Sequence, residues 1–173
     1  MPLYAFEGKK PIIGDNCFIA PNATIIGNVT FGKNCSVWFN TVIRGDVNRI
    51  IIGDCTNIQD SSIIHVNVEK ETIIGNNVTI GHGVLVHACE IKDRALIGNR
   101  SVIHDRAIIG EESLIAPGCV VTDRTEIPPR SMVMGIPGKI KRVINEKDLE
   151  KMRGVNGRYQ ALISRYRKNF IEL

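Results

Sequence analysis

The stretch IKDRALIGNRSVIHDRAIIGEESLIAPGCVVTDRTEIPPRSMV, from Ile91 to Val133, repeats one rule every six residues. A large apolar residue stands at each sixth position, a small or β-branched residue follows four places later, and glycine, asparagine and aspartate gather between the two. Earlier parts of the chain obey the same rule with two changes of register. The large apolar positions there are Ile13, Ile19, Ile25, Phe31, Val37, Ile43, Ile52, Ile58, Ile64, Ile74, Ile80 and Val86.

A period of six fits neither an α-helix, which repeats every 3.6 residues, nor a flat sheet, which repeats every two. Short strands joined by tight corners do fit. The large residue and the small or β-branched residue of each hexad are four positions apart. Because this number is even, both face the same side of the strand. Glycine, asparagine and aspartate supply the left-handed backbone angles that corners need. The pattern therefore predicts an all-β solenoid, a parallel β-helix with coils about 4.8 Å apart.

We expect a single domain over residues 1–173, with the β-helix over 8–138 and a helical segment over 144–171. Pro128-Pro129 and Gly135-Ile-Pro-Gly138 break the hexad pattern, and Asn145 is suited to cap a helix. Gly154 and Gly157 are expected to separate a short helix from a longer one. The apolar side chains at near-helical spacing, which we expect to pack along the coils, are Leu149, Met152, Tyr159, Leu162, Tyr166 and Phe170.

Composition narrows the classes of function. The five cysteines are scattered without a C-x-x-C motif, which argues against a disulfide scaffold or a thiolate metal site. Residues 139–173 hold ten Lys or Arg against four Asp or Glu, but no interleaved aromatic residues, so we expect a solvated helix face and no nucleic-acid partner. The chain shows no secretory signal and no apolar run of about 18 residues, so we expect no membrane partner and a cytoplasmic location.

Three of the four histidines, His65, His82 and His87, fall within residues 63–87. His65 and His87 each follow a large apolar position by one, so they should point outward together from stacked coils. His82 follows Ile80 by two and should face another way. Zinc needs three protein ligands, and a threefold trimer would bring His82 of one subunit to His65 and His87 of the next. The alternative is three unconnected surface histidines, which is how we interpret His104.

The segments SVWFNTVIRGD (36–46), NIQD (57–60) and TIGHGVLVHAC (79–89) resemble the γ-class carbonic anhydrase family of the hexapeptide-repeat superfamily. The resemblance covers residues 8–170. It implies a left-handed triangular β-helix of about seven coils, a homotrimer, and a metal held by two histidines of one chain and one of the next. The implied ligands are His65, His82 and His87, and the implied metal is Zn²⁺, with Fe²⁺ or Co²⁺ as alternatives.

The resemblance implies roles for six further residues. It places Gln59 where it would orient a metal-bound hydroxide, Asn57 near the carbon dioxide or bicarbonate pocket, and Tyr159 among the active-site residues. An amide beside a metal-bound hydroxide fits the way second-layer groups orient what a metal binds. Tyr159 has a plain alternative as a core residue of the C-terminal helix.

The remaining three residues are charged. By the same resemblance, Arg44 and Asp46 form salt bridges and hydrogen bonds at the subunit interface, with Asp60 as their charged partner. Interface pairing alone would also explain all three. Val47 departs from the family pattern, because relatives carry there a glutamate that helps protons leave the site. The absence of this glutamate would slow turnover without abolishing metal binding. Asn99-Arg100 departs as well, since relatives have small residues there.

Three functions remain open. The first is reversible hydration of carbon dioxide to bicarbonate by a zinc-dependent carbonate dehydratase, a lyase. The second is acyl transfer or thioester hydrolysis on coenzyme A esters, because Gly135-Ile-Pro-Gly-Lys139 resembles the ending of hexapeptide acyltransferases. The third is a metal-binding trimer without catalysis. Three histidines aimed at one point favour the first, because acyltransferases need one catalytic histidine.

Overall fold

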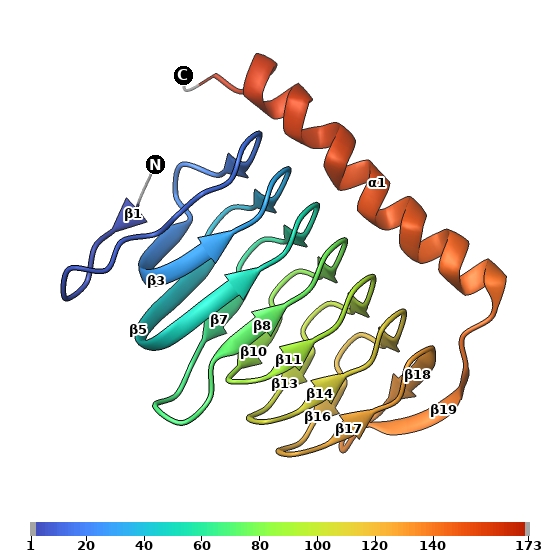
Figure 1. Ribbon diagram of the computed structural model, residues 1–173. Helices are drawn as coiled ribbons and strands as arrows, with labels where there is room; N and C mark the ends of the chain where they lie inside the picture. Colours follow the sequence, from blue (N-terminus) through green and yellow to red (C-terminus); the bar gives the residue numbers. More distant parts are fainter. Residues whose placement is uncertain (1–2, 172–173) are drawn as a thin grey trace.

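Each hexad folds as a short strand, and the strands of successive coils pair in parallel around one axis. The computed structural model describes residues 3–171 (Figure 1). One ladder is an eight-stranded sheet made of β2 (Phe18–Ile19), β4 (Ser36–Val37), β6 (Asn57–Ile58), β9 (Thr79–Ile80), β12 (Leu96–Ile97), β15 (Leu114–Ile115), β18 (Ser131–Met134) and β19 (Lys139–Val143). Seven of these are parallel neighbours, one for each coil.

The other strands form an eleven-stranded sheet that covers the two remaining sides of the solenoid. It contains β1 (Leu3–Tyr4), β3 (Thr24–Phe31), β5 (Val42–Ile52), β7 (Ile63–His65), β8 (Thr72–Ile74), β10 (Leu85–His87), β11 (Glu90–Ile91), β13 (Val102–Ile103), β14 (Ile108–Ile109), β16 (Val120–Val121) and β17 (Glu126–Ile127). Strand β5 turns a corner, because residues 42–44 pair with β7 and residues 50–52 pair with β8. Each coil therefore has three faces, and the predicted parallel β-helix of about seven coils is confirmed.

The large apolar positions of the hexads form the core. All of them are buried except Ile13, which is half-buried at the first coil. The small positions follow the rule with two clear failures: Val68, in the loop between β7 and β8, is 74% exposed, and Val47 is 52% exposed. Val47 lies among the extra residues where β5 rounds a corner. The six-residue period, which predicts an inward side chain at this position, does not hold across these residues.

The corners adopt left-handed backbone angles, as the sequence predicts. The left-handed residue lies three places after most of the large apolar residues, as at Asn16, Asn34 and Asn77. In the later coils arginine often takes this place, contrary to the expected preference for glycine, asparagine and aspartate. The left-handed arginines are Arg94, Arg100, Arg106, Arg124 and Arg130.

The C-terminal segment is one continuous helix, α1 (Glu146–Asn169), and the predicted break into two helices is wrong. Gly154 and Gly157 lie inside it. Asn145 and Asp148 form a capping box at its start, and the helix then runs along the eight-stranded sheet, against β2, β4, β6 and β9 (Figure 1). Packing of a continuous apolar side outweighs about 1 kcal/mol of unfavourable propensity at each glycine.

The chain reaches α1 through β19, which runs antiparallel to β18 and follows the last coil. Ile144, just after β19, is buried with Leu149 and Met152 of the helix. Within residues 3–171, no helix is both long and apolar enough to cross a membrane.

Candidate metal centre

His65 and His87 lie side by side at the ends of β7 and β10. The two residues are register partners in the parallel ladder, as their shared hexad position predicts. The Nδ1 atom of His65 is 3.1 Å from Nε2 of His87. Two nitrogens bound to one tetrahedral zinc at about 2.0–2.1 Å would lie about 3.3 Å apart, so the spacing of this pair suits a shared ion.

A carboxylate occupies the remaining nitrogen of each ring. Asp46 Oδ1 is 3.0 Å from His65 Nε2, and Asp105 Oδ1 is 2.5 Å from His87 Nδ1. Metal-bound histidines usually donate their second N–H to a carboxylate or carbonyl, which fixes the tautomer and the ring orientation. Both rings therefore present a free nitrogen toward the same place, and this donor set fits a divalent metal.

The electrostatics of the site keep the His65 ring available as a ligand. Burial lowers the pKa of His65, and Arg44 and His87 lower it further, against the opposing effect of Asp46. Burial alone would raise the pKa of Asp46, but its hydrogen bonds with His65 and Arg44 outweigh burial and leave the pKa lowered. The result is a neutral imidazole beside a charged carboxylate, which is the state a metal ligand requires.

Asp105 is a site residue that the sequence reasoning missed. Its second oxygen, Oδ2, accepts a hydrogen bond of 2.5 Å from Asn67 Nδ2, in the loop between β7 and β8. Burial would raise the pKa of Asp105, but His87 and Asn67 lower it overall. Asp105 lies on the next coil, directly after His104, which the ladder places level with His87. His104 is exposed beside it, as predicted.

His82 lies at the other end of the same face of the solenoid. It lies in the turn before β10 whereas His87 ends β10, so the two histidines stand at opposite corners of this face. His82 Nδ1 is 2.9 Å from Asp60 Oδ2, and its Nε2 is 3.4 Å from the Tyr159 hydroxyl of α1. Burial raises the pKa of Tyr159, so the hydroxyl keeps its proton. His82 has the same carboxylate arrangement as the other two histidines, but it cannot reach them within one chain.

The other predicted site residues divide between the two ends. Asn57 and Gln59 are buried near the His82 end, where the Gln59 amide donates to Asn57 Oδ1 at 3.1 Å. Arg44 lies at the opposite end, where it pairs with Asp46. Within the chain, Asp60 therefore contacts His82 and not Arg44.

An apolar column separates the two ends. The outward-facing side chains of this face stack from coil to coil, and they are Val42, Ile63, Leu85, Val102 and Val120. Ile63 is 48% exposed. Beside His82, an open hollow of about 410 Å³ is lined by Asp60, His82, Gly83 and Arg100, among others. In the part of the chain that the structure describes, no three potential ligands are grouped around one point.

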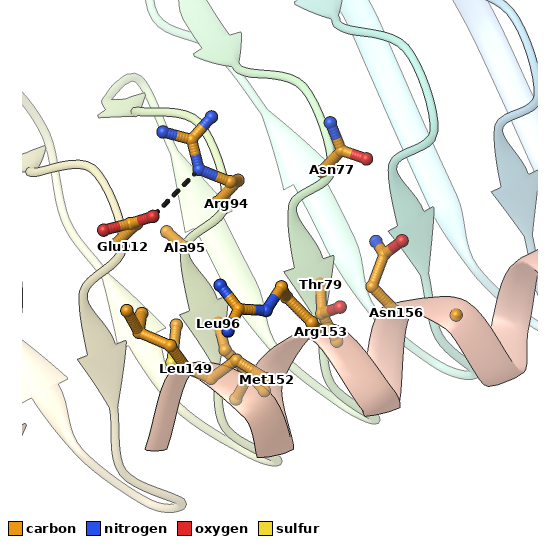
Figure 2. Close-up of a pocket in the computed structure, with 11 residues that line it drawn as sticks. Asn77, Thr79, Arg94, Ala95, Leu96, Glu112, Leu149, Met152, Arg153 and Asn156 are labelled. Carbon is orange, nitrogen blue, oxygen red and sulfur yellow. Dashed lines mark hydrogen bonds and ion pairs between the residues drawn. The ribbon is translucent and has the colours of Figure 1, made fainter. Parts of the chain in front are cut away.

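A separate cavity of about 270 Å³ lies between α1 and the eight-stranded sheet (Figure 2). Leu96, Leu149 and Met152 form its apolar part, and Arg94 on its rim is bonded to Glu112. No predicted site residue lines it. This cavity does not belong to the histidine centre.

Comparison with known proteins places the chain in a family. Residues 10–45 and 88–123 match the family described as bacterial transferase hexapeptide (six repeats). A solved structure of a putative acetyltransferase from Bacillus cereus has a TM-score of 0.93 and 41% identity, and the match covers 95% of each chain. The fold and these matches define a hexapeptide-repeat β-helix protein.

Two curated relatives narrow the assignment. The "Probable carbonic anhydrase" of Methanocaldococcus jannaschii is 52% identical over 151 residues, which cover 87% of this chain and 95% of that protein. The "Carbonic anhydrase" of Geobacillus kaustophilus is 43% identical over 157 residues, covering 91% of this chain and 86% of that protein. The chain belongs to the γ-class carbonic anhydrase-like family.

Proposed function

We propose that the protein is a homotrimeric metalloenzyme that hydrates carbon dioxide reversibly to bicarbonate. One observation carries the proposal. His65 and His87, each in contact with a carboxylate, face a common point at one end of an apolar face, and His82 lies at the other end of that face. Two curated relatives with matching names support the choice of reaction.

The trimer follows from the separation of the two ends. A second copy placed against the apolar column brings its His82 corner to the His65–His87 corner of the first. The contact joins different patches of the two copies, so it is heterologous, and a threefold rotation closes the ring. Each of the three interfaces then holds one metal, which gives one ion per subunit.

His65, His82 and His87 would hold the ion. Zn²⁺ fits three neutral imidazoles with one open position, and Fe²⁺ and Co²⁺ also accept imidazole. When bound, such an ion lowers the pKa of a water molecule to about 7 and so supplies hydroxide at neutral pH.

The chain's own residues would position the reactants. Asp46, Asp60 and Asp105 each hold one imidazole in a fixed orientation. The Gln59 amide, fixed on Asn57, would offer a hydrogen-bonding group to the nucleophile, and Asn57 would line the carbon dioxide pocket. Tyr159 would donate from its protonated hydroxyl near His82. Arg44 would meet Asp60 of the neighbouring copy, because the first stands at the His65 end and the second at the His82 end.

A second function, acyl transfer from a coenzyme A ester, is supported by the relative described as a putative acetyltransferase. One histidine paired with a carboxylate would suffice as its base, and His82 with Asp60 has that form. The proximity of His65 and His87 has no role in that reaction, so we favour hydration. A metal-binding trimer without catalysis is the third possibility, and only an assay separates it from the first.

Elemental analysis and a hydration assay on one sample test the proposal. Protein purified without oxygen should contain about one zinc, iron or cobalt ion per subunit, and stopped-flow measurement with a pH indicator should show hydration above the buffer rate. Metal without hydration leaves the non-catalytic trimer, and neither metal nor hydration favours acyl transfer. We also propose a cytoplasmic location, because all five cysteines are free thiols, as in a reducing compartment; cell fractionation tests it.

A further inference from the structure

The five arginines at left-handed corners form a natural comparison set. A non-glycine residue in this conformation costs on the order of 1–3 kcal/mol, so each position should have a compensating contact. Four of them do, because Arg94 pairs with Glu111 and Glu112, Arg106 with Glu69 and Asp123, Arg124 with Asp123, and Arg130 with Glu112 and Glu146.

Arg100 is the exception. Its side chain is exposed and lies over Gly83, and within residues 3–171 it makes no ion pair or hydrogen bond. Its backbone N–H donates to the carbonyl of His82 at 2.8 Å, and it lies on the next coil, one residue past Asn99, which stands level with the third candidate ligand. The carboxylate of Asp60 shares the same hollow but is bound to His82. Within residues 3–171 the Arg100 side chain is therefore available to a partner outside the chain.

The opposite end of the face offers a carboxylate at the matching height. Asp105 lies one coil beyond His87 and reaches back to it. Its side chain remains 30% exposed. The two oxygens of a carboxylate accept about four hydrogen bonds, and Asp105 receives one from Asn67 besides its contact with His87. It can therefore accept a guanidinium as well.

Two parallel copies align these residues. If His82 of one copy meets His65 and His87 of another, Arg100 and Asp105 face each other, because each lies on the next coil and one residue past the position level with its histidine. We propose that Arg100 pairs across the subunit interface with Asp105 of the neighbouring copy, and so acts as a positioning residue that fixes Asp105 against His87. This inference rests on the proposed shared metal site.

A double-mutant cycle tests the pair. The variants are Arg100→Ala, Asp105→Asn and the double variant, and the measurement is the dissociation of the trimer on dilution, followed by analytical ultracentrifugation. Each single change should weaken assembly by about tenfold or more per interface, since partly buried charge pairs couple by at least about 1.5 kcal/mol. The double variant should be no weaker than the worse single variant. Additive losses would overturn the pair.

Matched variants separate the pair from general effects. Arg94→Ala removes a left-handed arginine at a different corner and should leave assembly unchanged. Arg100→Lys keeps the charge and should restore most of the lost affinity. The visible absorption of the Co²⁺-loaded protein should change in Arg100→Ala and return in Arg100→Lys, because the orientation of His87 depends on Asp105.

Other outcomes identify what has failed. A trimer that holds metal normally but in which Arg100→Ala weakens only bicarbonate binding would overturn the pair and assign Arg100 to an anion. A folded wild-type chain that remains monomeric and binds no metal would overturn both the pair and the proposed function. Thermal unfolding by circular dichroism checks that each variant is folded.

Discussion

The three candidate ligands share one local arrangement, in which a carboxylate contacts one ring nitrogen of the histidine. His65 has Asp46, His87 has Asp105 and His82 has Asp60. The arrangement sets the tautomer before any ion arrives, so little ordering free energy is spent on binding.

Replacement of His82 tests its assignment as a ligand. The side chain is 48% exposed and lies outside the core, so His82→Ala should leave the β-helix folded while metal content falls by more than about tenfold. Elemental analysis and circular dichroism on the same sample measure both. The control is His104→Ala, an exposed histidine one coil further on, which should retain its metal. One metal per subunit in His82→Ala would show that the ligand assignment is wrong.

Replacement of Val47 tests whether the site lacks a group that carries protons to solvent. It is exposed beside Asp46, to whose Oδ1 its backbone N–H donates. A glutamate there would reach solvent next to the site, so Val47→Glu should raise hydration turnover by about a hundredfold, the lower end of the usual contribution of a positioned acid or base. Stopped-flow rates at low buffer concentration measure it. Val47→Gln has the same size without a titratable proton and should not change the rate, and equal rates in both variants would reject the idea.

The sequence predicted the ligand pair from hexad position alone, because a strand of stacked coils places equal positions above one another. It could not predict Asp105. Acidic residues are frequent at solenoid corners, and only side-chain orientation shows which of them turns back toward a histidine. The predicted pairing of Arg44 with Asp60 needs a second copy and stays a prediction.

At the scale of elements, the hexad rule succeeds wherever a coil has three equal sides. It fails at β5, where extra residues at the corner expose Val47. It also gives no information about β19, because a strand that runs backward follows no six-residue period. The predicted break at the two glycines is wrong for a different reason. The unfavourable helix propensity of glycine acts locally, whereas contacts with the sheet stabilise the whole helix. Nothing near Gly154 or Gly157 requires a glycine.

The start of α1 makes an acid-sensitive contact. Hydrogen bonds from Arg142 and from the backbone of Asn145 lower the pKa of Asp148 to about 2, from an ordinary value of 3.8. The contact should therefore contribute its full stability above about pH 4 and lose it as the pH falls toward 2. Asp148→Asn should remove this part of the pH dependence, measured by urea unfolding between pH 2 and 6. Glu150→Gln on the same helix is the control, and an unchanged acid slope in Asp148→Asn would contradict the assignment.

At the scale of the whole molecule, the apolar column is the surface that a second copy would cover. Ile63→Lys places a charge in its centre and should convert the trimer to a folded monomer, and metal affinity should fall with it because the third ligand belongs to another copy. Ultracentrifugation and metal titration measure the two effects.

The control for this prediction is Ile108→Lys, which adds the same charge to an outward position on a different face of the solenoid. It should remain trimeric. Monomers of Ile63→Lys that bind metal as tightly as the wild type would show that His82 of another copy is not a ligand.

The strand β19 runs antiparallel to β18 and so ends the stack of parallel coils. Its residues are exposed and include Lys139, Lys141 and Arg142. A strand from another molecule would meet a strand that runs in the opposite direction and carries three positive charges. It would not find the parallel edge strand with which another hexad could pair. The same six-residue repeat that builds the solenoid is thus kept from continuing between molecules as a fibre.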